Sequence, residues 1–336
     1  MNPRERVWAA LRGDQVDRPP MSFWGHSYHR ESSAADLVAA TLEFHARYGW
    51  DWVKLNPRKH YHVEPWGVSY RYPGIPDVKP VLDQCPIHDG DDWAKIGEVA
   101  HDAGALGEQL EAVRMLRSRL PGDVPMIQTV FTPFAILGEM TREPKDLLRH
   151  LDTHPALVRK ALEAVTIVFE RYVRAVLAAG AEGIYLATVD WASRDLMSPE
   201  RYAEWARPGD LRLLAAAGGA PFNVLHVCRR NNLLPELGHY PVAAFSWAPG
   251  DPGNLSLREA LTRVRGAVMG GIAHEGALLR DDPDAVSAEL QEAFEQTGGR
   301  HWLAAPSCSI LPATRPGQLQ RLRADVERIP MPRTAS

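Results

Sequence analysis

Short apolar runs alternate with longer stretches of helical periodicity along most of the chain. Each run is bounded by Gly, Pro, Asp or Asn, which is typical of a buried strand, whereas the longer stretches repeat apolar residues every three or four positions, as amphipathic helices do. We predict strands at 21–24, 50–55, 124–131, 183–190, 221–228, 242–249, 267–272 and 300–307. We predict helices at 1–14, 35–48, 106–120, 142–179 and 316–328, and at three further places that begin with Ser198, Ser256 and Asp282.

This alternation of strands and helices predicts an α/β fold with a parallel sheet. The chain has neither a GxGxxG nor a Walker A loop, and eight units fit one domain. A (β/α)₈ TIM barrel that spans residues 1–336 as a single domain is therefore favoured over an open doubly wound sheet. The first helix is an N-terminal extension of this barrel. Residues 60–74 are predicted to form a β-hairpin near the barrel mouth, with its turn at Trp66–Gly67.

Composition and charge narrow the functional classes. The formal net charge is −4 and there is no long basic run, so nothing attracts the chain to nucleic acid in general. No apolar run approaches the roughly 18 residues of a membrane span, and the N-terminus lacks the apolar block of a signal peptide. The three cysteines are too few for a disulfide framework, which favours a reducing compartment. We therefore expect a soluble, cytoplasmic protein with no membrane and no nucleic-acid partner.

A candidate metal site lies at two predicted strand ends. His226 and Cys228 stand two positions apart, so in an extended chain their side chains point to the same face. Cys308 follows the last predicted strand, and barrels gather their catalytic residues at such ends. One histidine and two cysteines suit a zinc ion and leave one tetrahedral position open. Zinc holds a substrate sulfur as thiolate, which can attack an electrophilic methyl group. The alternative is a structural histidine beside two unrelated thiols. Cys85, the third cysteine, is expected to be a loop residue with no role in the site.

Motifs along nearly the whole chain resemble the uroporphyrinogen decarboxylase superfamily. They are NPRERVWAALRGDQVDRPP, DWVKLNP, the E-x-W-G segment, MSPERYAEWARP, LHVC, MGGI and SCSILPATRPGQLQRL. Within the superfamily, LHVC followed by a late cysteine is similar to the His-x-Cys…Cys zinc motif of the corrinoid-dependent methyltransferases. That resemblance implies that His226, Cys228 and Cys308 bind zinc. It also implies methyl transfer from methylcobalamin, or from a corrinoid partner protein, to a thiol such as coenzyme M or to a pterin. A homodimer is a further expectation of the family.

Two other functions remain open. One is a decarboxylase or lyase that acts on a carboxylated substrate without metal. The decarboxylase branch resembles this chain in fold, but it holds its substrate with an arginine-rich segment where this chain has SFWGHSYHR. The other is a non-catalytic protein that binds a metal or a corrinoid. The more distant cobalamin-independent methionine synthases add a Glu ligand to a similar motif, and Asp251 is the nearest candidate for that role here.

Several polar and aromatic residues are candidates for the surrounding pocket. The methyltransferases usually have Gly after the cysteine of LHVC, whereas this chain has Arg229 and Arg230. These guanidinium groups either bind an anionic substrate or form a cap or salt bridge at the next helix. Asp190 is either a catalytic acid or a hydrogen-bond anchor. The remaining candidates, which either line the site or pack as ordinary rim and core residues, are His26, Tyr28, Asn56, Lys59, His60, His274, Trp24, Trp191 and Trp247.

Overall fold

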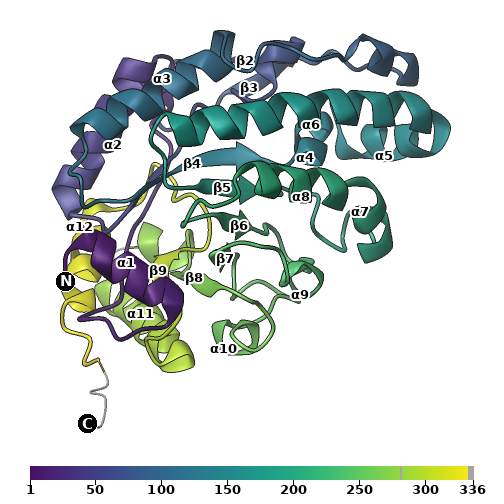
Figure 1. Ribbon diagram of the computed structural model, residues 1–336. Helices are drawn as coiled ribbons and strands as arrows, with labels where there is room; N and C mark the ends of the chain where they lie inside the picture. The colour runs from purple at the N-terminus through teal and green to yellow at the C-terminus, as the bar shows by residue number, and fades with distance from the viewer. Residues whose placement is uncertain (281, 332–336) are drawn as a thin grey trace.

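Seven parallel strands form one curled sheet in the computed structural model, which describes residues 1–280 and 282–331 (Figure 1). Along the sheet they are β1 (Val53–Leu55), β4 (Met126–Phe131), β5 (Ile184–Ala187), β6 (Val224–His226), β7 (Ala244–Ser246), β8 (Ala267–Ile272) and β9 (Trp302–Pro306). This spatial order is also the chain order, as a barrel requires. The predicted α/β barrel is confirmed, and most of its strands are shorter than predicted.

Residues 21–25 take the place of the eighth strand. They form parallel bridges to β9 and its continuation, Met21 to Ala304 and Gly25 to Ile310. On their other side, the Asp51 amide donates a hydrogen bond of 2.9 Å to the Met21 carbonyl. The segment therefore lies between the last and first strands of the sheet, although its pairing is too sparse for a regular strand.

Buried ion pairs stabilise the seam of the barrel, which is the junction between the last and first strands that residues 21–25 fill. The Asp51 carboxylate accepts hydrogen bonds from Arg6 (2.6 Å), from both terminal nitrogens of Arg18 (2.7 and 2.9 Å) and from the Met21 amide (2.8 Å). All three charged side chains are buried, so each charge depends on its partners for compensation.

Helix α1 (Pro3–Arg12) closes the N-terminal end of the barrel. It begins at a capping box between Asn2 and Glu5, with Pro3 at its first position. Val7 packs into the cluster that fills the barrel interior, and Trp8 meets Phe222 edge to face at 5.6 Å. The predicted N-terminal helix is thus the floor of the barrel.

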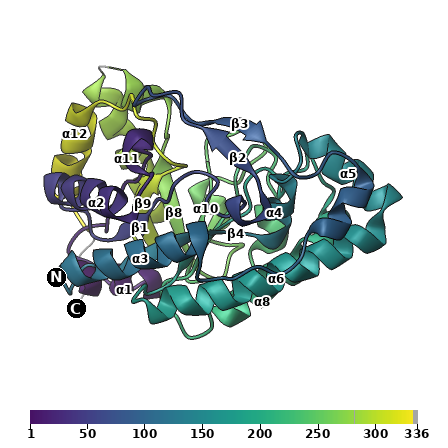
Figure 2. The same ribbon diagram turned by 90° about the horizontal axis from the view of Figure 1, so that it is seen from above.

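Helices cover the outside of the sheet (Figures 1 and 2). Helix α2 packs on α3, α6 runs along α8, and α11 packs on α12. Their bounds, with those of the shorter helices, are α2 (Ala34–Tyr48), α3 (Gly104–Arg119), α4 (Pro133–Gly138), α5 (Pro144–Thr153), α6 (Pro155–Ala178), α7 (Pro199–Trp205), α8 (Arg207–Ala216), α9 (Leu234–Leu237), α10 (Leu257–Ala260), α11 (Pro283–Thr297) and α12 (Pro316–Val326). The predicted helical tract 142–179 is interrupted at Pro155, which begins a new helix. Within the part of the chain that the structure describes, no helix combines the length and apolar character of a membrane span.

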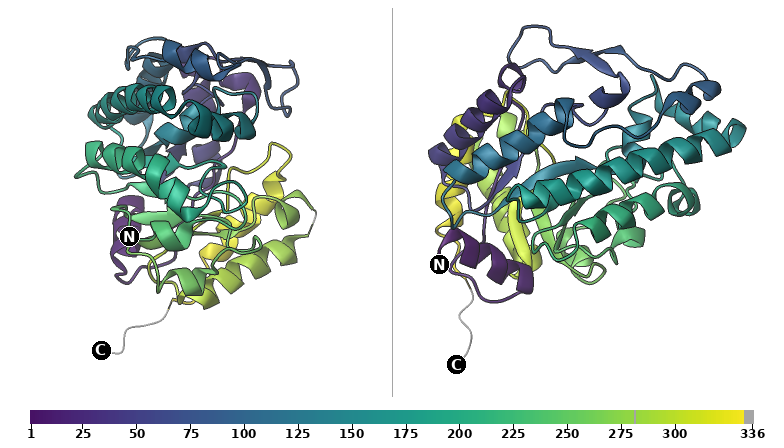
Figure 3. Two further views of the ribbon diagram at one scale, coloured as in Figure 1. Left: turned by 90° about the vertical axis from the view of Figure 1, so that its right-hand side faces the viewer. Right: turned by 45° about the horizontal axis from the view of Figure 1, so that its top comes forward.

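The predicted hairpin at 60–74 is wrong in its boundaries. Residues Glu64–Trp66 form a 3₁₀ turn (η2) that ends at Gly67, whose φ of 88° suits glycine. The antiparallel pair is instead β2 (Ser69–Arg71) with β3 (Val81–Gln84), joined by a longer loop. Figure 3 shows this hairpin on the side of the molecule away from α1.

The barrel interior is apolar toward the amino ends of the strands and mostly polar toward their carboxyl ends. Trp52, Ile127, Tyr185 and Val224 belong to the cluster that also receives Val7 of α1. Side chains two positions further along a strand point to the same face. The next inward positions toward the carboxyl ends are therefore Lys54, Thr129, Ala187, His226 and Ser246. This mostly polar layer lies directly beneath the candidate site, at the carboxyl ends of the strands.

Candidate metal centre

His226, Cys228 and Cys308 converge at the carboxyl ends of two strands. His226 is the last residue of β6, and Cys308 lies two residues beyond β9. Their ligand atoms all lie within 4.8 Å of one another. This spacing suits three ligands of a single metal ion. Asp251 is not part of the group, so its carboxylate does not complete the site in this structure.

The hydroxyl groups of Ser246 and Tyr185, which we call the hydroxyl chain, orient the His226 ring. The ring is 3% exposed, and its Nδ1 lies 3.1 Å from Ser246 Oγ. Ser246 Oγ in turn lies 3.1 Å from the Tyr185 hydroxyl, and the Tyr185 ring stacks on the imidazole with 5.1 Å between centroids. A hydrogen bond at Nδ1 leaves Nε2 for a metal and fixes the ring, as outer-shell partners of zinc-bound histidines do.

The sulfurs of Cys228 and Cys308 lie within 4.8 Å of each other. Interaction with the neighbouring Cys228 lowers the pKa of Cys308 well below its usual value, and His226 adds to this effect. The proximity of Cys308, together with burial, raises the pKa of Cys228. A cation between the two sulfurs would stabilise both as thiolates, so the donor set fits a thiophilic metal such as zinc.

Two non-glycine residues, one beside Cys228 and one beside Asp190, have a left-handed backbone. Arg229, directly after Cys228, has a φ of 69°, and Val189, directly before Asp190, has a φ of 51°. Such values cost little for glycine but are unusual for other residues, and β-branched valine tolerates them least. The left-handed φ at 229 is one that glycine adopts at lower cost than arginine. Residues so constrained often mark functional sites.

Both predicted anion-binding arginines already have carboxylate partners. Arg229 Nε donates to Asp190 Oδ1 at 2.5 Å, and Arg230 Nε donates to Asp195 Oδ2 at 2.8 Å. The arginine side chains are 63% and 67% exposed. The structure thus shows the salt-bridge alternative, and it places Asp190 in a pair with Arg229 at the rim. Roles for these residues in catalysis or substrate binding stay predictions.

Two of the three tryptophans predicted at the mouth, Trp191 and Trp247, pack in the main hydrophobic core. Trp247 is fully buried and donates from Nε1 to the Leu255 carbonyl at 2.7 Å. It follows the inward Ser246 and so points outward. Trp191 is 3% exposed and packs edge to face on Phe134 at 5.0 Å. For these two residues the structure shows the core-packing alternative.

Three other candidates are held in place by neighbouring side chains. His26 Nδ1 lies 2.9 Å from the buried Glu31 carboxylate, and its ring stacks on Tyr28 at 4.9 Å. His274 Nδ1 lies 2.8 Å from the hydroxyl of Ser307, the residue before Cys308. These contacts fix the three side chains, and roles for them in the site stay predictions.

A second histidine cluster lies on the same side of the sheet. His60 Nδ1 and His62 Nε2 both contact Glu139 Oε2, at 2.9 and 3.0 Å. Burial lowers the pKa of His60 to about 4. Among the residues that the structure describes, these three side chains do not meet the spacing of a metal group. They are a hydrogen-bonded anchor for the segment before the hairpin.

Lys54 is not among the residues that the sequence predicts for the site. This residue points into the barrel from β1, is 5% exposed and donates from Nζ to Asn56 Oδ1 at 2.7 Å. Its ammonium lies over the rings of Trp24 (5.3 Å) and Tyr185 (4.5 Å). The signal was a lysine inside an apolar run, at an inward position between Trp52 and Asn56.

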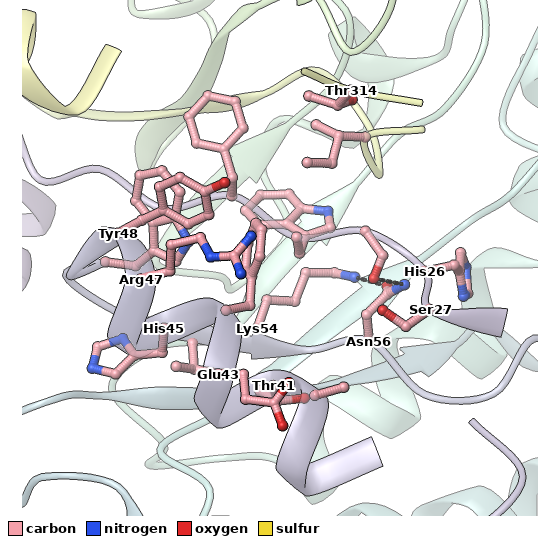
Figure 4. A pocket seen from close by; sticks show the side chains of 18 of the residues that line it. His26, Ser27, Thr41, Glu43, His45, Arg47, Tyr48, Lys54, Asn56 and Thr314 are labelled. Atoms are coloured by element: carbon pink, nitrogen blue, oxygen red, sulfur yellow. Dashed lines mark hydrogen bonds between the residues drawn. The ribbon is translucent and has the colours of Figure 1, made fainter. Parts of the chain in front are cut away.

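A cavity of about 300 Å³ borders Lys54 (Figure 4). It lies between α2, the 23–31 segment, β1 and the loop after β9, and Figure 4 shows the Lys54–Asn56 bond at its wall. The metal-ligand cluster is not part of its lining. The candidate metal site is therefore defined by the convergence of His226, Cys228 and Cys308 and not by this cavity.

Comparison with known proteins gives a consistent result. A model of the uroporphyrinogen decarboxylase (URO-D) family matches residues 2–329. A methylcobamide:CoM methyltransferase, MtaA, from Methanosarcina barkeri is 24% identical over 328 residues, which cover 93% of each chain. A uroporphyrinogen decarboxylase from Syntrophotalea carbinolica is 26% identical over 200 residues, 57% of this chain and 55% of that protein.

A solved structure shares the whole architecture. It is a methyltransferase from Methanosarcina mazei, with a TM-score of 0.83 and 22% identity, and the match covers 98% of this chain and 99% of that one. At this identity the likeness establishes the fold, and the activity has to be argued from the site.

Proposed function

Because the chain belongs to the uroporphyrinogen decarboxylase family, we propose that it is a zinc-dependent methyltransferase of that family. In this proposal His226, Cys228 and Cys308 bind one zinc ion, and an acceptor thiol or pterin takes the methyl group of a methyl-corrinoid. The observation that carries the proposal is the convergence of one imidazole and two sulfurs within 4.8 Å at the barrel mouth. Three protein ligands of this type leave a coordination position for a substrate.

The protein's own groups suit this chemistry. A zinc ion in the site would lower the pKa of a bound thiol, so that the acceptor is a thiolate at neutral pH. Ser246 and Tyr185 hold the His226 ring in one orientation. Asp190 and Arg229 neutralise each other at the rim, so neither adds a free charge beside the sulfurs.

The names of similar proteins support the donor and the acceptor. The MtaA relative covers nearly all of both chains, and its name specifies a methylcobamide donor and CoM, a thiol, as acceptor. The decarboxylase relative matches little more than half of each chain. A decarboxylase also has no evident use for two adjacent sulfurs beside an imidazole. We therefore infer that methyl from a corrinoid, free or carried by a partner protein, is the donor substrate.

The test combines metal analysis with a methyl-transfer assay. The purified protein should contain about one zinc per chain, and it should methylate at least one member of a panel of thiols and tetrahydropterins from free methylcobalamin. Cys228→Ala and Cys308→Ala should each lose most of the zinc and the activity, because each substitution removes both a bond and a negative charge.

Cys85→Ala is the matched control. Cys85 is a buried thiol whose sulfur contacts the Ile87 carbonyl at 3.9 Å, outside the ligand group. Its loss should change neither zinc content nor methyl transfer. Full zinc and full activity in Cys308→Ala would overturn the proposal. A zinc-free protein with decarboxylase activity would support the decarboxylase alternative instead.

A further inference from the structure

The cavity beneath helix α2 is separate from the candidate metal centre. Its volume is about 300 Å³, at the lower end of the range for small-molecule pockets, and none of the three candidate metal ligands lines it. Its walls are formed by α2, residues 23–31, β1 and the loop that leads from β9 into α12 (Figure 4). The protein therefore has a second space for a ligand, with a lining of its own.

An aromatic cluster around Trp50 forms the apolar part of this lining. Tyr48 and Phe23 pack on the ring of Trp50, with 5.0 and 5.2 Å between centroids. Phe44 of α2 contacts both Trp50 and Tyr48, at 5.9 and 5.1 Å. Aromatic rings pack on one another at such distances, so this cluster suits a flat, aromatic ligand.

Four polar atoms of the lining residues have no hydrogen-bond partner. Within residues 1–280 and 282–331, they are the indole nitrogens of Trp50 and Trp52, the Thr314 hydroxyl and His45 Nδ1. Buried polar groups are nearly always satisfied, and an unsatisfied one commonly marks an absent water, ion or ligand. Because an indole nitrogen can only donate, the walls of the cavity lack hydrogen-bond acceptors.

Both carboxylates of the lining are already bound to other groups. Glu43 receives two hydrogen bonds from Arg30, at 2.5 and 2.9 Å. Glu31 accepts a hydrogen bond of 2.7 Å from the Ser27 amide and lies 2.9 Å from His26 Nδ1. Neither carboxylate is left to form an ion pair with another cation of the cavity.

Two cations of the lining, Arg47 and Lys54, lack a paired carboxylate. Arg47 is exposed in the last turn of α2, whereas Lys54 is 5% exposed on β1. Among the residues that the structure describes, neither forms an ion pair. Lys54 has three N–H donors, of which one binds Asn56 Oδ1 at 2.7 Å. A buried ammonium without a counter-charge is costly, so the cavity favours an anion.

We propose that this cavity binds a small aromatic carboxylate, at a site separate from the metal centre. The ring of the ligand packs on the aromatic cluster around Trp50, and its carboxylate accepts hydrogen bonds from the free N–H groups of Lys54. Arg47 attracts the anion from the exposed end of α2, and exclusion of water strengthens the pairing with Lys54. This inference goes beyond methyl transfer, because neither zinc nor a methyl donor takes part in the binding.

Calorimetric titration of the metal-free, full-length protein tests the proposal. The probes are benzoate, phenylacetate and indole-3-acetate, and each is compared with acetate and with the neutral alcohol of the same ring system. At least one aromatic carboxylate should bind with a Kd about tenfold or more below the values for acetate and for its own alcohol. Equal affinities for the carboxylate and the alcohol, or no binding of any aromatic probe, would overturn the proposal.

A variant that fills the cavity locates the ligand. Ala40 of α2 lines the cavity, so Ala40→Phe places a ring in the space and should weaken binding by about tenfold or more. Ala35→Phe is the matched control, because Ala35 is exposed on the same helix and is not part of the lining. It should leave the Kd unchanged. Undiminished binding in a folded Ala40→Phe protein would place the ligand elsewhere and overturn the proposal.

Two charge variants cover the case in which Ala40→Phe fails to fold. Lys54→Met should weaken binding of the carboxylate by about tenfold and leave the Kd of the alcohol within about threefold. Arg47→Gln should have a smaller effect that disappears at high salt, because Arg47 is exposed. Lys145→Met, at a lysine that is 76% exposed and paired with Glu143, is the control. An undiminished preference for the carboxylate in Lys54→Met would refute the proposed site.

Dependence on zinc distinguishes this cavity from the metal centre. The aromatic carboxylate should bind equally to the zinc-loaded protein, to the metal-free protein and to Cys308→Ala. Binding that requires zinc, that is lost in Cys308→Ala or that methylcobalamin displaces would assign the ligand to the metal centre and overturn the proposal. Absence of methyl transfer would refute the proposed function only, since the titration does not depend on activity.

Discussion

Replacement of Ser246 by alanine tests whether the hydroxyl chain behind His226 belongs to the metal centre. Ser246 Oγ connects His226 Nδ1 and the Tyr185 hydroxyl, with 3.1 Å to each. All three side chains are buried, so Ser246→Ala leaves two polar groups without their partner. Each such group costs about 1–3 kcal/mol. The free energy of unfolding of the zinc-free protein should therefore fall by about 2–4 kcal/mol, after some relaxation of the two rings.

The same change should weaken zinc binding. Loss of an outer-shell hydrogen bond to a ligand typically reduces metal affinity by about 10–100-fold, or about 1.4–2.7 kcal/mol. Zinc affinity is measured by competition with a chromophoric chelator, and stability by urea unfolding of the chelated protein. Thr166→Val is the control, since Thr166 is a buried hydroxyl that donates to the Leu162 carbonyl within α6, far from the ligands in sequence and fold. Unchanged zinc affinity in Ser246→Ala, within about twofold, would refute the assignment of the Ser246 hydroxyl to the metal centre.

Three further predictions concern charge. Asp51→Ala should lower the free energy of urea unfolding by about 3–5 kcal/mol, because Arg18 loses the carboxylate that holds both its terminal nitrogens; an effect below about 1 kcal/mol would contradict the seam role. Burial raises the pKa of Asp210 to about 7, so the folded state resists ionisation, and stability should fall by up to about 4 kcal/mol as pH rises from about 4 to 7. In Asp210→Asn this slope, measured by urea unfolding at several pH values, should disappear, and its persistence would assign it to other groups. Zinc content after dialysis should fall progressively on acidification, because protons compete with the metal for the sulfurs; pH-independent zinc would exclude Cys228 and Cys308 as ligands.

The convergence of His226, Cys228 and Cys308 could be predicted from the sequence because a parallel barrel brings the carboxyl ends of its strands to one rim. His226 and Cys228 needed only the two-residue period of a strand, and Cys308 needed only its place after another strand. Their distance along the chain does not matter once both strands belong to one sheet. The resemblance to the uroporphyrinogen decarboxylase family gave the same three residues.

Lys54 and Ser246 were missed for a physical reason. Each lies within a strand, and its importance depends on what faces it across the barrel, which the sequence does not show. Strand parity alone would have corrected Trp247, since a residue next to the inward Ser246 must point outward. Trp247 directly follows β7, whereas Trp191 lies four residues beyond the end of β5, where parity no longer applies. The hairpin boundaries failed because β2 pairs across a long loop with β3, and a distant partner leaves little local signal.

The contacts that stabilise the barrel and the candidate metal site lie at opposite ends of the barrel. This separation indicates whether a bound metal would be needed for the fold. At the amino end, α1 fills the floor with Val7, and Asp51 binds Arg6 and Arg18 across the seam between the first and last strands. These contacts involve none of the metal ligands. At the carboxyl end, the strained residues Val189 and Arg229 and the close sulfurs of Cys228 and Cys308 carry conformational and electrostatic cost. A barrel already closed at its amino end tolerates that cost, so a metal bound by these cysteines would serve chemistry rather than stabilise the fold.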